Sequence, residues 1–211
     1  MSVAESIWVD ILVTSLVEWC AVLTGIMYVI LASRKMMICW LFAFVSSVLY
    51  VYICYNYQLY IESMLQVFYV AMAVYGWLMW QKDKDSDKAI ENLLDSQKGS
   101  GIKSWSLNKH LINISISGVA SFILGYIFFE YTDQKNPFTD AFTTVFSLAA
   151  TFMVTQKILE NWLYWIVIDA VSIYLYSGRG LHLSAVLYFV FTVLAVVGYV
   201  SWYKQKNRHR A

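Results

Sequence analysis

The sequence has little charge and almost no proline. Of its 211 residues, 14% are charged and 60% are hydrophobic, and the net charge is +1. Soluble domains are about 25% charged, so this chain has too little polar surface for a water-soluble monomer, and it is too apolar to be disordered. The near-zero net charge gives no reason to expect a nucleic-acid partner. A single proline, Pro137, and an 18% share of aromatic residues are typical of a helical membrane protein.

Motifs for catalysis, metal binding and ATP binding are also missing. The three cysteines, Cys20, Cys39 and Cys54, lie inside apolar runs, so we predict neither a disulfide framework nor a metal site. There is no phosphate-binding GxxxxGK[ST] loop, nucleophile elbow or HExxH motif. We therefore predict no cofactor, no direct use of ATP and no enzymatic activity. The N-terminal segment lacks the basic region of a signal peptide, so the first apolar run is predicted to be retained.

The apolar runs predict an all-α membrane protein with seven transmembrane helices, since a span needs about 20 mostly apolar residues. The expected spans are about 12–32, 37–54, 59–80, 111–129, 140–155, 162–176 and 181–203. The fifth and sixth are short and contain polar residues. Segment 81–109 mixes Lys, Asp, Ser and Gly, which indicates a solvated connector and not a further domain.

The distribution of basic residues predicts the orientation in the membrane. With seven spans, thirteen of the fifteen Lys and Arg residues fall on the side of the C-terminus, and Lys135 and Arg179 fall on the other side. Basic residues concentrate on the cytoplasmic side of membrane proteins. We therefore expect an integral membrane protein with its N-terminus outside and its C-terminus in the cytoplasm.

An internal repeat divides the predicted helices. A shift of 122 residues aligns 40–80 with 162–202 without a gap, and 10 of 41 positions are identical. This predicts a 3+1+3 organisation with boundaries at 1–80 for the first three-helix unit, 81–110 for the cytoplasmic connector, 111–136 for a linking fourth helix and 137–211 for the second unit. The linking helix gives both units the same orientation. Parallel repeats of this kind place a substrate site at their interface near mid-membrane; the alternative is a repeat kept only for packing.

Asp169 is the most informative polar residue, because it lies midway along the sixth predicted span. Ionisable groups inside spans are costly and usually functional. Helical spacing places Trp162, Trp165, Ser172 and Tyr176 on the same face. A carboxylate beside two indoles suits an organic cation, through ion pairing and cation–π contact. The alternative is that Asp169 hydrogen-bonds to a neighbouring helix.

The third span supplies a second candidate group. Glu62, Gln66 and Tyr69 are spaced i, i+4 and i+7. A Gln amide both donates and accepts, which suits a ligand amide or an aminopyrimidine, whereas Glu62 is either a ligand residue or simply solvated near the outer end. The repeat pairs Gln66 with Tyr188, which we predict to be an aromatic wall of the site.

Hydroxyl groups line one face of the fifth span. Ser147 is the candidate ligand residue among them, with Thr144 and Thr151 on the same face. Such hydroxyls bind a ligand or hydrogen-bond between helices.

Several other residues are assigned structural or solvated roles. Four tryptophans near span ends are interpreted as interfacial anchors; they are Trp19, Trp77, Trp80 and Trp202. His110 is expected in a cytoplasmic segment without a role.

Three segments together resemble one known family. They are EWCAVLTGIMYVILASRKMMICWLFAFVSSVLY (18–50), LQVFYVAMAVYGWLMW (65–80) and NWLYWIVIDAVSIYLYSGRGLHLSAVLYFVFTVLAVVGYVSW (161–202). They resemble the PnuC family of vitamin transporters, and W-x-x-W-x-x-x-[ND] is the most specific part. The resemblance implies a full-length SWEET-like fold with 3+1+3 helices. It also implies facilitated diffusion of nicotinamide riboside, thiamine or riboflavin across the bacterial inner membrane, with trapping of the vitamin by a cytoplasmic kinase.

The family motif falls on Trp162, Trp165 and Asp169, and the resemblance implies that Gln66 and Tyr69 face them. Riboside carriers tend to have Asn where this chain has Asp169. Thiamine is a permanent cation with an aminopyrimidine, so the acid slightly favours thiamine. Nicotinamide riboside is also cationic and is the alternative.

The sequence therefore predicts a vitamin uniporter that contacts membrane lipid and leaves homo-oligomerisation open. The rival from another class is a membrane-embedded binding or scaffold protein that does not transport. A membrane enzyme and a carrier of neutral sugars are further alternatives, the latter disfavoured by an acid between indoles.

Overall fold

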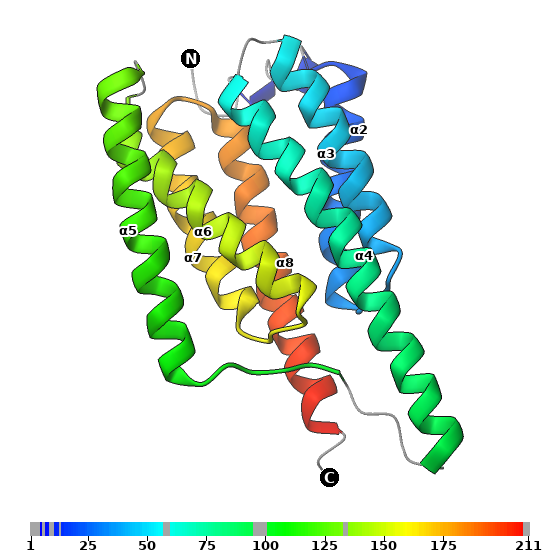
Figure 1. Ribbon diagram of the computed structural model, residues 1–211. Helices are drawn as coiled ribbons and strands as arrows, with labels where there is room; N and C mark the ends of the chain where they lie inside the picture. The colour runs from blue at the N-terminus through cyan, green and yellow to red at the C-terminus, as the bar shows by residue number, and fades with distance from the viewer. Residues whose placement is uncertain are drawn as a thin grey trace. The chain divides into compact units, whose positions relative to one another are not determined.

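The computed structural model describes residues 5, 7–8, 11–12, 14–56, 60–94, 101–132 and 135–208. Seven long helices follow one another in this part of the chain (Figure 1): α2 (Leu16–Ser33), α3 (Cys39–Asn56), α4 (Tyr60–Leu94), α5 (Leu107–Tyr131), α6 (Pro137–Thr155), α7 (Asn161–Gly178) and α8 (His182–Arg208). The one β-type pairing among the described residues is an isolated parallel bridge between Lys103 and Ile158. The predicted all-α class is confirmed.

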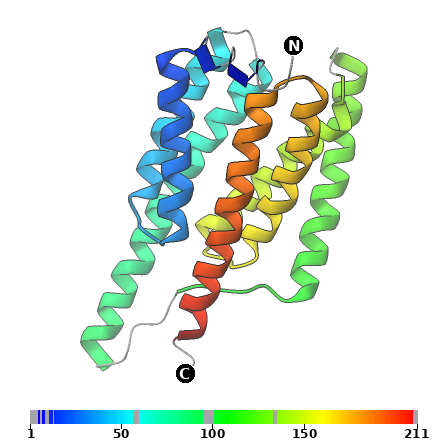
Figure 2. The ribbon, with the colours of Figure 1, turned by 180° about the vertical axis from the view of Figure 1, so that it is seen from behind.

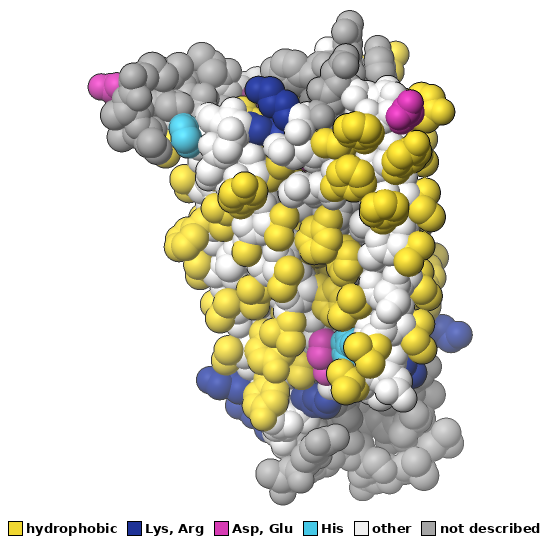
Figure 3. Space-filling view, turned by 90° about the vertical axis from the view of Figure 1, so that its left-hand side faces the viewer, with side chains coloured by type: hydrophobic (Ala, Val, Ile, Leu, Met, Phe, Trp, Pro, Cys, Tyr) yellow, Lys and Arg dark blue, Asp and Glu magenta, His cyan; other side chains and the backbone are white. Residues whose placement is uncertain are grey.

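Six of these helices are long and apolar enough to cross a membrane, namely all except α7. α7 is 18 residues long but carries Asn161 and Asp169, which lower its hydropathy. Hydrophobic side chains cover the middle of the face shown in Figure 3, and Lys and Arg side chains lie towards its ends. On α5, Ile116 and Phe122 are about two-thirds exposed. Such apolar exposure is expected where lipid is the solvent, so the chain is an integral membrane protein, while the seventh span and the parallel repeat stay predictions.

The helices group into two compact units that interleave along the chain. Unit 1 comprises residues 1–13, 104–153 and 160–196, and unit 2 comprises 14–103, 154–159 and 197–211. Unit 1 therefore contains α5, most of α6, α7 and the first part of α8. Unit 2 contains α2, α3 and α4, the turn after α6 and the last part of α8.

Unit 2 begins with a well-capped helix. Ser15 is the N-cap of α2: its Oγ accepts a hydrogen bond from the Glu18 backbone N–H at 3.2 Å, and the Glu18 carboxylate accepts one from the Ser15 N–H at 2.7 Å. This reciprocal capping box satisfies two N–H groups that have no intrahelical partner. Glu18, an acid near a predicted span end, therefore serves to begin a helix. α2 packs on α3, and α3 packs on α4.

α4 is longer than the predicted span. It continues to Leu94, well into the segment expected to be a solvated connector from residue 81. Its sequence there, QKDKDSDKAIENLL, contains many good helix formers, which favour continuation of the helix into solvent. Residues 95–100 of the connector lie outside the described residues.

Two lysines occupy left-handed turns at helix ends. Lys35 follows α2 and Lys157 follows α6, and each has φ of 55°. At Lys35 the turn is closed by hydrogen bonds from Lys35 N–H to Ala32 O (2.9 Å) and from Met36 N–H to Leu31 O (3.0 Å). This is the Schellman arrangement, in which glycine is usual and a side chain costs about 1–2 kcal/mol. The 122-residue shift pairs these two lysines, so it pairs residues with the same uncommon conformation.

Trp80 and Trp202 are not interfacial anchors, and that interpretation is wrong for them. They are 3% and 0% exposed, and their rings lie 6.4 Å apart in unit 2. Trp80 Nε1 donates to Thr155 O at 3.2 Å, and Trp202 Nε1 donates to Ala32 O at 3.0 Å. The acceptors are carbonyls in the last turns of α6 and α2, where the regular intrahelical hydrogen bonds end; the Ala32 carbonyl also accepts from the Lys35 N–H. The indole at the end of each predicted repeat thus donates a hydrogen bond to a carbonyl at the end of the first helix of the other repeat.

Gly76 allows the Trp40 ring to lie directly against α4. A Cβ atom at Gly76 would lie 2.5 Å from three ring atoms of Trp40, which is 2% exposed. We expect Gly76→Ala to lower the free energy of unfolding in detergent by about 1–3 kcal/mol, because overpacking forces a buried ring to move. Gly118→Ala is the control, since a Cβ there meets nothing within 4 Å. Equal effects of the two substitutions would contradict this packing.

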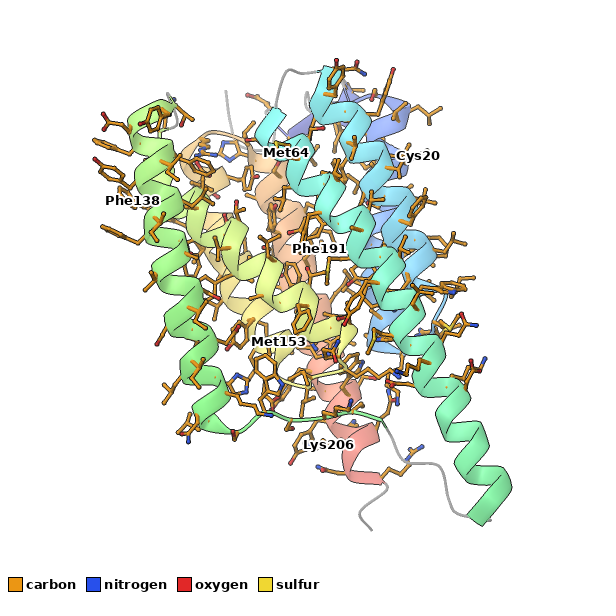
Figure 4. The ribbon with its side chains drawn as sticks, viewed as in Figure 1. Cys20, Met64, Phe138, Met153, Phe191 and Lys206 are labelled. Carbon is orange, nitrogen blue, oxygen red and sulfur yellow. The ribbon has the colours of Figure 1, made fainter. Side chains whose placement is uncertain are left out.

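In unit 1, α6 packs on α5 through a similar close approach. The ring of Phe138, labelled in Figure 4, lies against Gly125, where a Cβ atom would come within 2.5 Å of it. Phe122 and Phe129 of α5 flank this ring, with centroids at 5.8 and 6.4 Å. The absence of a side chain at Gly125 therefore sets how closely α6 approaches α5.

A tight turn joins α7 to α8 at the same end of unit 1 as the start of α6 (Figure 2). Gly180 adopts a φ of 75° there, and the Leu181 N–H bonds to Tyr176 O at 2.9 Å. Beside this turn, Arg179 forms a 2.6 Å ion pair with Asp140 of α6. Asp140 therefore fastens the start of α6 to the end of α7.

Candidate functional site

The central candidate, Asp169, is buried in the middle of α7. It is 2% exposed, and Trp162 and Ser172 on the same face are 3% and 2% exposed. None of the ion pairs formed among the described residues involves Asp169. A carboxylate held in such surroundings loses hydration that a cation can replace. The arrangement therefore suits a ligand that brings a positive charge to this face.

Trp165 is partly fixed by α6. It packs, with Phe142 and Tyr164, against a buried apolar cluster made of Phe146, Ala150 and Ile168. This contact orients the second indole of the motif relative to the helix that carries Ser147.

Ser147 is buried on α6, at 8% exposure. Its carbonyl accepts a 2.8 Å hydrogen bond from the Thr151 hydroxyl one turn later. The Thr151 hydroxyl thus bonds within its own helix, which is neither of the two roles expected for this row of hydroxyls.

Two further candidates, Tyr176 and Tyr188, lie together in unit 1. Their rings stack with centroids 5.1 Å apart and planes inclined by 16°. Phe191, labelled in Figure 4, packs edge-on against Tyr188 at 6.2 Å. A cavity of 270 Å³ lies beside the α7–α8 turn, where Ser177 and His182 contribute to its lining. The motif residues of α7 do not line it.

Glu62, Gln66 and Tyr69 form a separate group on α4. All three are part-exposed, and their helical spacing places them on one face. They belong to unit 2, whereas the α7 residues belong to unit 1. That Gln66 and Tyr69 face the motif stays a prediction.

Trp40 is a buried residue that sequence reasoning left out of the site. Its Nε1 atom has no hydrogen-bond partner among the described residues, and its ring meets Trp80 edge-on at 5.4 Å. The signal was present, because the repeat pairs Trp40 with Trp162 and Ser47 with Asp169. The two predicted repeats therefore share the first indole of the motif but not the acid.

His110 also has a role that the sequence did not suggest. Its Nδ1 lies 3.1 Å from the Tyr164 hydroxyl, and its Nε2 lies 3.8 Å from the Glu160 carboxylate. The Trp105 ring packs on the His110 ring at 5.6 Å between centroids, and the backbone N–H of Trp105 donates to the Glu160 carboxylate at 3.3 Å. The cluster joins the start of α5 to the start of α7, next to Trp162. No sequence pattern links His110 to Tyr164, 54 residues away.

No group of three or more His, Cys, Asp or Glu side chains is placed to hold a metal within the ranges that the structure describes. The candidate residues of unit 1 are an acid, a hydroxyl and aromatic rings, and those of unit 2 are an acid, an amide and a tyrosine.

Comparisons with known proteins agree on one family. The family model described as nicotinamide mononucleotide transporter matches residues 15–204. The nicotinamide riboside transporter PnuC of Escherichia coli is 26% identical over 203 residues, covering 89% of this chain and 85% of that protein. The PnuC protein of Neisseria mucosa is 26% identical over 196 residues, covering 90% of this chain and 72% of that protein.

A solved structure has the same fold. The crystal structure of the vitamin B3 transporter PnuC superposes with a TM-score of 0.72 at 23% sequence identity, covering 98% of this chain and 91% of that chain.

Proposed function

The chain belongs to the nicotinamide mononucleotide transporter family, the PnuC family of membrane transporters, and we propose on this basis that it carries nicotinamide riboside. Two relatives that match about nine-tenths of the chain carry this vitamin in their names. The sequence slightly favours thiamine only because Asp169 is an acid and thiamine is a permanent cation. Because nicotinamide riboside is a cation as well, the acid is compatible with both, and the relatives favour the riboside.

The buried carboxylate of Asp169 is the single observation that supports a cationic substrate most strongly. In the proposed complex, Asp169 balances the charge of the pyridinium ring, and Trp162 and Trp165 contact the ring faces. Cation–π contacts of this kind contribute about 0.5–2 kcal/mol each. Gln66 reads the carboxamide of the vitamin, because an amide side chain can donate and accept at once.

Transport is proposed to be facilitated diffusion, driven by the gradient of the vitamin. Among the predicted site residues, no basic side chain accompanies the acid to form a pair for ion coupling. A cytoplasmic kinase would keep the gradient by phosphorylating the imported vitamin. The proposed orientation, with the C-terminus in the cytoplasm, follows from the basic residues on that side.

Titration of the purified protein tests the choice of vitamin. We expect nicotinamide riboside to quench tryptophan fluorescence at a concentration at least about tenfold below thiamine or riboflavin, a difference of about 1.4 kcal/mol. Trp162→Phe, titrated in parallel, shows how much of the signal comes from the motif. Tighter binding of thiamine or riboflavin would overturn the assignment.

A further inference from the structure

The turn that follows α6 is held unusually firmly for a surface turn. Lys157, in its left-handed conformation, is only 9% exposed. Its Nζ lies 2.8 Å from an Asp83 carboxylate oxygen of α4 and 5.3 Å from the centre of the Trp80 ring. Glycine would suit this backbone better. Lys157 therefore has an unfavourable backbone conformation, and its side chain makes an ion pair and a cation–π contact at once.

The backbone of the same turn is held by the end of the connector. The Lys103 N–H bonds to Lys157 O at 2.9 Å, and the Leu159 N–H bonds to Lys103 O at 2.8 Å. Ile102, the residue before Lys103, is 7% exposed. The turn is thus fastened on one side to α4, through its lysine, and on the other side to residues 101–103.

The place of this turn in the chain suggests what the fastening does. Residues 154–159 belong to unit 2, although the helices they join, α6 and α7, lie mostly in unit 1. α7 carries the candidate site. A carrier that exposes its site alternately to the two sides must let helix ends part on one side at a time. The ion pair and the backbone hydrogen bonds of this turn join helix ends that the distribution of basic residues predicts to be cytoplasmic.

We propose that the Lys157–Asp83 ion pair, seated on Trp80, is a latch that must open for the vitamin to leave towards the cytoplasm. This inference depends on the proposed transport function. The Asp83 side chain is one-third exposed and that of Lys157 is 11% exposed, so water reaches the pair from one side and hydrates both charges when they separate. A partly exposed ion pair of this kind is stable enough to keep the turn on α4, and it can separate because water then hydrates both charges.

A cross-link tests whether the pair must separate. We would introduce Asp83→Cys and Lys157→Cys together in a Cys20→Ser background, because Cys20 is exposed whereas Cys39 and Cys54 are buried. Because the lysine side chain fills the space between the two positions, the thiols are joined with a short, reducible bis-methanethiosulfonate cross-linker and not by a direct disulfide. Cross-linking is expected to slow uptake of labelled nicotinamide riboside into proteoliposomes at least tenfold, and reduction is expected to restore it. Binding of the vitamin should persist in the cross-linked form. Equal uptake by the cross-linked and reduced protein would overturn the latch.

Single substitutions distinguish a latch from a permanent brace. Lys157→Gly suits the left-handed backbone, and Asp83→Asn keeps the shape of the acid. Removing a latch should raise the maximal uptake rate about threefold or more, with the half-saturating concentration within twofold of the original. Asp85→Asn, an exposed acid two residues along α4, should change neither. Uptake no faster than in the unsubstituted protein would refute the latch, whereas an unsubstituted protein that does not transport the riboside would refute the proposed function instead.

Discussion

Asp169→Asn is expected to weaken binding of nicotinamide riboside by about 10- to 100-fold, or about 1.4–2.8 kcal/mol. Asp169 is 2% exposed in the middle of α7, so its charge acts on a bound cation with little screening by water. Asn has nearly the same shape and keeps one acceptor oxygen, but it carries no charge. Fluorescence titration of the two proteins measures the difference.

The stability of the same variant separates binding from folding. An unpaired buried charge is unfavourable in the empty protein, so we expect Asp169→Asn to unfold at the same or a higher denaturant concentration than the unsubstituted protein. Asp140→Asn is the matched control, because Asp140 is already paired with Arg179 at 2.6 Å. It should lower stability without a comparable loss of affinity. Unchanged affinity in Asp169→Asn would contradict the proposed site.

Trp202→Ala is expected to lower the free energy of unfolding by about 3–5 kcal/mol, the range for deleting a buried large aromatic side chain. Trp202 is fully buried and donates to the carbonyl of Ala32 at the end of α2. The substitution leaves a cavity beside Trp80 and removes one of the hydrogen bonds that the Ala32 carbonyl accepts. Denaturant unfolding in mild detergent measures the loss.

Two further variants show which part of the indole matters. Trp202→Phe keeps a ring but removes the N–H donor, and we expect a loss of about 1–2 kcal/mol. Trp77→Ala removes a part-exposed tryptophan, which is the environment that an interfacial anchor would have, and should cost less than Trp202→Ala. If both alanine variants had the same small effect, Trp202 would be an anchor after all.

The helical class and the most prominent buried acid were predictable because they follow from local patterns. Apolar runs of sufficient length define helices, and an acid inside such a run is conspicuous in any sequence. The repeat pairs Lys35 with Lys157, and the two share a backbone conformation. Because the 122-residue shift pairs two residues with the same uncommon φ, it indicates that the turns after α2 and α6 have the same geometry.

The roles that sequence reasoning missed depend on partners far away along the chain. Trp80 meets the end of α6 and Trp202 meets the end of α2, 75 and 170 residues away. Interfacial tryptophans and tryptophans that hydrogen-bond to helix ends both lie near the ends of spans in the sequence. Only their neighbours in the folded structure distinguish the two kinds. The contact of His110 with Tyr164 and the pairing of Asp140 with Arg179 are further examples.

The predicted repeats share a backbone conformation at Lys35 and Lys157 but differ in chemistry. Trp40 and Trp162 are both buried, but Ser47 stands where the second repeat has Asp169. The acid of the motif is therefore present in one of the two predicted repeats.

Counterflow in proteoliposomes tests the central claim most directly. Liposomes that contain the protein and are loaded with unlabelled nicotinamide riboside should transiently accumulate the labelled vitamin from outside. This should occur without any ion gradient, and protein-free liposomes should show no accumulation. Absence of counterflow from a protein that binds the riboside would contradict the account and identify a binding protein that does not transport.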